Sequence, residues 1–262
     1  MQISLIEFSV ENFKAFKNKV TFSMVARKGK HTFESNSENL LRTSFIYGPN
    51  ASGKTSLFDA FVNLKQGVLL SANNKENPEL PYMPFLGSEV SRTKPIFFEL
   101  VFSVKSDTDE IYRYSFSFVR DHIVTESMVK ISSGGKEEKY ISRIEQDIKV
   151  GKGFEDVKIL ADKTRKEALF LSTAAQFNSK LAIGILEAIK NINIISGVTY
   201  QVYQQFTVKK LKEDPEYKEK ILKYLKEADF CISGERIQEV DVSTVDIKDN
   251  PKEFSAVKKI EK

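Results

Sequence analysis

The chain has 262 residues, of which 41% are hydrophobic and 29% are charged, as expected for a globular protein with a sizeable core. The net charge of +4 is too small to indicate nucleic-acid binding by itself, although a local basic face stays open. A single cysteine and two histidines argue against a disulfide framework and a protein-only zinc site, and there is no signal peptide or run of about 20 apolar residues, so we expect a cytoplasmic protein without a membrane partner.

Two strands are predicted at the start of the chain. Residues 3–10 alternate between apolar and polar side chains, and Val20, Phe22 and Met24 continue that period in a second strand. The polar segment 27–42 follows, with a basic cluster at its start. A solvated loop is the interpretation, and a contact with a phosphate backbone is the alternative.

The sequence Gly48–Thr55 (GPNASGKT) matches the phosphate-binding pattern G-x-x-x-x-G-K-[ST] at every fixed position. The apolar run Ser44–Tyr47 before it predicts a buried strand, and apolar residues recur after it at helical spacing, at Leu57, Phe61, Leu64 and Val68. A glycine loop in this setting wraps a phosphate with backbone N–H groups at the positive end of a helix. An ordinary turn before a helix is the simpler alternative.

This motif predicts an ATP site that also holds Mg²⁺. Lys54 would supply charge to the β- and γ-phosphates, and the Thr55 hydroxyl would hold the magnesium ion. The predicted nucleotide-binding residues of this loop are Gly48, Pro49, Asn50, Ala51, Ser52, Gly53, Lys54, Thr55 and Ser56.

After the helix that follows the loop, the spacing of the apolar residues changes twice. A proline-rich loop is expected over 71–95, and strands over 96–102, 112–118, 123–131 and 139–141 predict an antiparallel meander, whose aromatic face should pack against the element that carries the loop. Helices are expected over about 168–176, 181–192 and 214–228, the last with Ile221, Leu222 and Leu225 buried, before a strand-like tail over 237–247.

The usual machinery of ATP hydrolysis is missing from the sequence. No apolar strand ends in the Asp-Glu pair that positions magnesium and polarises water, and Ile96–Glu99 lacks the aspartate. Ser132–Lys136 (SSGGK) is similar to the signature of ABC ATPases, but it joins two strand-like segments and is interpreted as a hairpin turn.

The opening Ile6–Phe16 (IEFSVENFKAF), followed by GPNASGKT with Asn50 at its third position, resembles the head domain of SMC/RecF-like ABC ATPases. Within that group the chain is most similar to RloA-like AAA-type proteins of prokaryotic defence loci. The further matches are Tyr112–Phe116 with Ile123–Glu126, Ala168–Ser172 leading to Gln176–Asn178, and Tyr224–Phe230.

The resemblance implies an α/β P-loop NTPase fold, here a partial ABC-head-like domain with an antiparallel meander and a helical C-terminal part. Residues 1–160 would form the nucleotide-binding lobe and 161–262 a helical region after the Q-loop. It also implies that Gln176 is the Q-loop glutamine that touches Mg²⁺ and the attacking water, that Lys14 approaches the nucleotide, and that Asn50 lies near the γ-phosphate.

Family members continue with the signature, the Asp-Glu strand and a switch histidine, and this sequence stops before them. The expected partners are therefore the missing C-terminal ATPase half or a second head in a homodimer, with an effector protein and nucleic acid left open. The leading hypothesis is an ATP-binding part that hydrolyses ATP only when completed and dimerised, with a possible role in anti-phage defence. The alternatives are a regulatory module controlled by nucleotide occupancy without hydrolysis, and a phosphotransferase. Two predicted strands precede the loop here, whereas small P-loop kinases start almost at the loop, which argues against a phosphotransferase.

Overall fold

The computed structural model describes residues 2–26, 32–35, 38–73, 80–105, 110–132, 135–196 and 201–228. The chain divides into two compact units, residues 1–194 and 195–262. The boundary expected at residue 160 falls inside the first unit, because Phe154, Phe170 and Ile185 from the segments on either side of it share one hydrophobic core with the sheet.

An antiparallel sheet of seven strands, in the order β2-β1-β5-β6-β7-β8-β9, is the base of the first unit. The strands are β1 (Gln2–Glu11), β2 (Val20–Ser23), β5 (Ile96–Lys105), β6 (Glu110–Phe118), β7 (Ile123–Ile131), β8 (Glu137–Ile144) and β9 (Asp147–Val150). The predicted meander is therefore confirmed, and its turn at Ser132–Lys136 joins β7 to β8. β9 was not predicted, because four residues are too few to show a clear alternation of apolar and polar side chains.

Alternation along the strands gives the sheet one apolar face. On β6 the side chains of Tyr112, Tyr114 and Phe116 are buried, while Arg113 and Ser115 between them are partly exposed. The register sets Phe98 of β5 opposite Phe116, with their rings 5.7 Å apart in an edge-on contact. Aromatic pairs of this kind add stability beyond the area that they bury.

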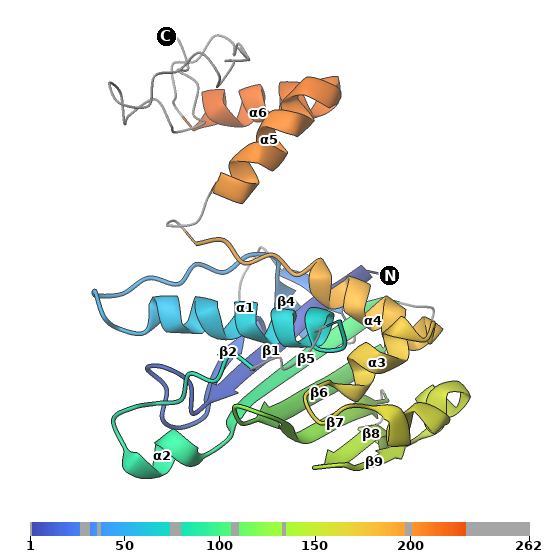
Figure 1. Ribbon diagram of the computed structural model, residues 1–262. Coiled ribbons are helices and arrows are strands. Elements are labelled where there is room, and N and C mark those ends of the chain that lie inside the picture. The colour runs from blue at the N-terminus through green and yellow to red at the C-terminus, as the bar shows by residue number, and fades with distance from the viewer. Residues whose placement is uncertain are drawn as a thin grey trace, which may run out of the picture. The chain divides into compact units, whose positions relative to one another are not determined.

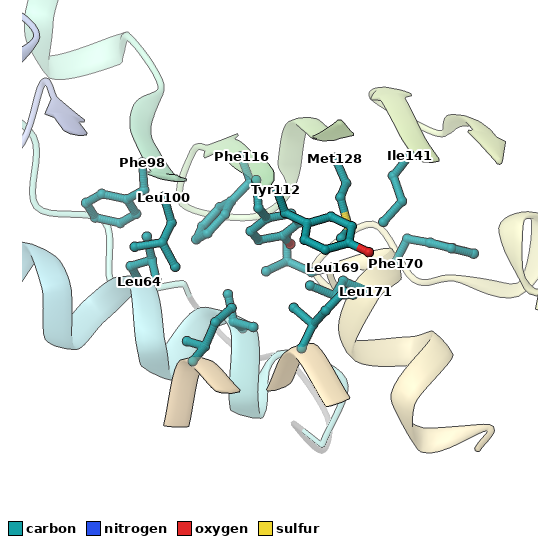
Figure 2. Packing of buried hydrophobic residues seen from close by; sticks show 14 of the residues in the cluster. Leu64, Phe98, Leu100, Tyr112, Phe116, Met128, Ile141, Leu169, Phe170 and Leu171 are labelled. Carbon is teal, nitrogen blue, oxygen red and sulfur yellow. The ribbon is translucent and has the colours of Figure 1, made fainter. Parts of the chain in front are cut away.

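Helix α1 (Lys54–Leu70) lies across this apolar face, with α3 (Phe170–Gln176) and α4 (Lys180–Lys190) nearby (Figure 1). The ring of Phe61 on α1 meets Phe8 of β1 edge-on, with 5.0 Å between the ring centres. Gly67 lets the helix approach closely, since a Cβ there would lie 3.3 Å from the Phe116 ring. Figure 2 shows Leu64 of α1 facing the residues of the strands and the start of α3. The aromatic face thus packs on the helix that follows the loop, as predicted.

The strand predicted over Ser44–Tyr47 does not form. β4 (Glu38–Leu41) pairs with β3 (Thr32–Ser35), and its backbone also pairs with Met24 and Val25. This pairing ends at Leu41, before the chain reaches Ser44. The chain from there to α1 runs as a loop (Figure 1). Phe45 is 86% exposed and Tyr47 is 92% exposed. A run of strand-forming residues becomes a strand only when another strand pairs with it, and the described part of the chain supplies none here.

A buried charged cluster joins α3 to the sheet. Glu126 of β7 accepts hydrogen bonds from the backbone N–H groups of Phe170 (2.7 Å) and Leu171 (3.0 Å) and from the Tyr114 hydroxyl (2.9 Å). Arg143 of β8 lies 3.8 Å from this carboxylate and donates to the carbonyl oxygens of Ala168 and Glu145. Burial raises the pKa of Glu126, against the opposing effects of these amides and of Arg143.

Two further helical segments of the first unit are the 3-10 segment η1 (Lys152–Lys163) and the short α2 (Glu89–Thr93), neither of which was predicted. In the second unit, α5 (Gln201–Glu213) was not predicted, whereas α6 (Pro215–Glu227) was. α6 begins with Asp214 as N-cap, but it has no buried residue, so the burial expected for Ile221, Leu222 and Leu225 is wrong: they are only partly covered.

Two predicted features lie outside the described residues: the basic cluster at 27–31 and the strand-like tail over 237–247. None of the helices in the described ranges is both long and apolar enough to cross a membrane.

Candidate functional site

The Gly48–Thr55 segment, called the phosphate loop below, folds as a compact loop before α1. Ala51 has φ 62° and Gly53 has φ 93°, both in the left-handed region. Residues in this region turn successive backbone N–H groups toward one side, which makes an anion-binding concavity. Gly53 suits its position because a side chain there would be strained and would meet the Phe16 ring at 3.4 Å.

A hollow of about 150 Å³ lies within the phosphate loop, lined by Ala15, Ala51, Ser52, Gly53, Lys54, Thr55 and Ser56. The last six of these belong to the loop and to the first turn of α1. Gly48, Pro49 and Asn50 are not among the lining residues; Asn50 is exposed at the loop's turn. The structure therefore brings six of the nine predicted loop residues to one concave surface, while their role in nucleotide binding stays a prediction.

The start of α1 favours an anion in this hollow. Gly53 is the N-cap and offers no side chain to the first N–H groups of the helix, and the first turn contains no acidic residue. Those N–H groups therefore face the hollow without a capping partner. The Lys54 ammonium lies over the loop, where it donates hydrogen bonds to the carbonyl oxygens of Gly48 (2.8 Å) and Pro49 (2.7 Å).

The turn Asn12–Phe16 lies beside the hollow and lines it through Ala15, a role that the sequence analysis missed. Phe13 and Phe16 exchange backbone hydrogen bonds of 2.9 and 2.8 Å, and Asn12 and Lys14 have φ of 53° and 44°. The Asn12 side chain is buried and donates to the carbonyl oxygens of Ser91 and Lys94, both at 2.8 Å. Asn12 was the available sequence signal for this turn, because asparagine tolerates the left-handed region.

Lys14 lies beside the site, and its ammonium is 2.5 Å from the Asp59 carboxylate of α1. Its neighbour Ala15 lines the hollow. The contact with a nucleotide that the resemblance implies for Lys14 stays a prediction, and it would have to compete with Asp59.

Gln176 does not meet the phosphate loop. Its side chain donates to Asn73, three residues beyond the end of α1. The 17 residues of α1 separate that end from Lys54, and a helix of this length spans about 25 Å. In this arrangement Gln176 cannot reach a magnesium ion held at Thr55. The helical pattern located its helix correctly but could not show at which end of α1 that helix packs.

The described residues contain no group of three or more His, Cys, Asp or Glu side chains arranged to hold a metal ion. Glu99, the carboxylate rejected in the sequence analysis, pairs with Lys19 at 2.8 Å instead. The donor set at the loop, one threonine hydroxyl beside a phosphate-sized hollow, fits a magnesium ion that takes its other ligands from phosphates and water.

A search of curated proteins found no match. A family model described as an AAA domain, with the AbiEii toxin of a type IV TA system as a candidate member, matches residues 44–176. The match begins just before the phosphate loop, runs through the meander and α3, and covers just over half of the chain. The chain therefore belongs to this family of AAA-type, ATP-binding P-loop ATPases.

Proposed function

We propose that the phosphate loop encloses the triphosphate of ATP and that Thr55 contributes one ligand to the accompanying Mg²⁺. The single observation that supports this most strongly is the hollow between the left-handed Ala51 and Gly53 and the uncapped start of α1. When bound, magnesium neutralises charge on the β- and γ-phosphates.

Lys54 has the central electrostatic role in this proposal. Its ammonium now satisfies two carbonyl oxygens of the loop. Phosphate oxygens are stronger partners for an ammonium, because hydrogen bonds between ionised groups are about twice as strong as neutral ones. We therefore expect Lys54 to bond to the β- and γ-phosphates and the loop to tighten around them.

Hydrolysis, in this proposal, needs groups that the described residues do not supply. Asp59 of α1 is a carboxylate close to the loop in the sequence, but it is paired with Lys14. A second ATPase half, as in SMC/RecF-like heads, would bring the missing carboxylates and a signature segment, and two heads would enclose the nucleotide between them. The similarity to RloA-like proteins favours a cytoplasmic role in defence.

Ligand-induced stabilisation tests the binding step. ATP with Mg²⁺ at a hundredfold excess over Kd should raise the free energy of unfolding by about 2.7 kcal/mol. Lys54→Ala should remove most of this gain, whereas Lys149→Ala, which changes an exposed lysine on β9, should keep it. Equal stabilisation of the wild type and Lys54→Ala would refute the assignment.

A turnover assay separates the two candidate functions. The isolated chain should show negligible ATPase activity, and turnover of about 1 s⁻¹ would mean that a complete site exists. If a completing half restores turnover, the chain is part of an enzyme. If ATP changes only the assembly of the two polypeptides, the chain is an occupancy-controlled module.

A further inference from the structure

Helix α1 contains one acidic residue, Asp59, and it lies close to the predicted phosphate site. Asp59 comes four residues after Thr55 and three after Ser56, which both line the hollow. Residues at these spacings share one face of a helix, with about 5–6 Å between their Cβ atoms, and their side chains lean toward the helix N-terminus. Asp59 therefore lies one helical turn from Thr55, on the same face of α1.

A negative charge at this position opposes the binding of an anion in the hollow. The N–H groups at the start of α1 attract phosphate, and a carboxylate one turn further along the helix offsets part of that attraction. Only 27% of the Asp59 side chain is exposed, so water screens its charge incompletely. An unpaired Asp59 would therefore weaken the site that the phosphate loop forms.

Lys14 neutralises this charge from the turn that borders the hollow. Its ammonium lies 2.5 Å from the Asp59 carboxylate. The backbone of Lys14 is held in place, because its N–H group donates a hydrogen bond of 3.0 Å to the carbonyl oxygen of Met83. The next residue, Ala15, lines the hollow. The cation is thus supplied at the edge of the site, and the carboxylate keeps it outside the list of groups that face the hollow.

We propose that Lys14 and Asp59 form a charge-setting pair for the phosphate loop. Lys14 assists ATP binding by neutralising Asp59, and not by contact with the nucleotide, and Asp59 in turn holds the ammonium away from the hollow. This inference rests on the proposed function, because the charge of the pair matters only if the hollow takes an anion.

The proposal predicts opposite effects for the two single substitutions. Lys14→Met leaves an unpaired carboxylate near the phosphates and should weaken ATP binding. Asp59→Asn removes that carboxylate and releases a cation, so binding should be at least as tight as in the wild type. The double variant lacks both charges and should bind nearly as the wild type does. A pair that only supports the fold would behave differently, because either substitution breaks the same ion pair and both would weaken binding alike.

Isothermal titration calorimetry of the full chain with ATP and Mg²⁺ at low ionic strength tests this pattern. Lys14→Met should raise Kd about tenfold, and the double variant should return to within about threefold of the wild type. Added salt should reduce the effect of Lys14→Met, because it screens the repulsion. Glu137→Gln is the matched control: it removes an ion-paired carboxylate on β8, where Glu137 pairs with Arg113 at 2.9 Å, and should leave Kd unchanged.

Three results would overturn the proposal. A double variant as weak as Lys14→Met would mean that Lys14 contacts the nucleotide itself. Equal weakening by the two single substitutions, with equal losses of stability in urea, would mean that the pair only supports the fold. An unchanged Kd in Lys14→Met would mean that the pair does not act on the site.

Inorganic pyrophosphate, titrated in parallel, separates this proposal from the proposed function. If the wild type binds pyrophosphate with the expected order of variants but does not bind ATP, the proposed function is refuted and the charge-setting pair stands. If the wild type binds ATP and the variants do not follow the expected order, the pair is refuted and the proposed function stands. Binding of neither ligand refutes both.

Discussion

Replacing Glu126 by alanine should be among the most damaging single changes in the first unit. The carboxylate is fully buried and accepts three hydrogen bonds, from two backbone N–H groups of α3 and from Tyr114. It is also the counter-charge of the buried Arg143. The substitution therefore removes the group that links β6, β7 and β8 to the first turn of α3.

The expected loss of stability follows from the hydrogen-bond donors that lose the Glu126 carboxylate as their acceptor. Each buried donor left without an acceptor costs about 1–3 kcal/mol, and Glu126→Ala leaves Phe170, Leu171 and Tyr114 in that position. Arg143 keeps its carbonyl partners but loses its counter-charge. Since the variant also avoids the desolvation of a carboxylate, we expect a net loss of about 3–5 kcal/mol, as for other broken buried pairs.

Urea unfolding followed by circular dichroism measures this loss. Glu137→Ala is the matched control, because Glu137 lies in the neighbouring strand β8 and pairs with Arg113 at the surface. An exposed pair of this kind is worth at most about 1 kcal/mol. If the two variants lose similar free energy of unfolding, the buried cluster does not stabilise the fold as argued.

Three further outcomes are expected. Burial raises the pKa of Glu126 above its ordinary 4.5. The stability gained by proton uptake is therefore complete below pH 4.5 and is lost as pH rises through the raised pKa. In a urea series, the unfolding free energy of the wild type minus that of Glu126→Gln should fall with rising pH. Gly53→Ala should lose about 1–2 kcal/mol, because φ at this residue is 93°, and should also lose ATP affinity in a titration. Asn12→Ala should lose about 2 kcal/mol by calorimetry, because it removes the donor to the buried Ser91 carbonyl and to the partly buried Lys94 carbonyl.

Each outcome has its own control. A difference that grows with pH would mean that the pKa of Glu126 is lowered in the folded protein. Gly135→Ala carries similar backbone strain, at φ 75° in the β7–β8 turn, with nothing within 4 Å. It should match Gly53→Ala in stability but keep ATP affinity, and parallel losses of affinity would contradict the assignment of the loop. Asn18→Ala, at an exposed position near the same turn, should leave stability unchanged.

Local patterns were enough to predict the phosphate loop, the helix after it and the meander. The phosphate-loop pattern is contained in eight consecutive positions, and the alternation of apolar and polar side chains along β6 needs only nine residues. The hairpin at Ser132–Lys136 could also be separated from an ABC signature by its strand-like flanks. These features depend on interactions between residues close in the sequence, or on which face of an element is apolar.

Other features depend on partners far away in the chain, so local patterns could not predict them. Ser44–Tyr47 has the composition of a strand, but no strand lies beside it in the described residues. Gln176 lies on a helix, as expected, yet α3 packs at the end of α1 opposite the loop. The contact between Lys14 and Asp59 joins residues 45 positions apart and had no sequence signal.

The sequence by itself determined that a phosphate-binding loop joins the first strands to a helix, and that an aromatic-faced meander follows. The glycines, Lys54 and the two-residue period encode these directly through backbone freedom, charge and side-chain direction. The tertiary structure alone decided that Ala15 lines one side of the hollow, that Glu126 and Arg143 are buried together, and that residues 43–47 have no strand partner among the described residues. Each of these depends on which surfaces meet, since a strand, a buried charge or a binding wall exists only when its partner is in place.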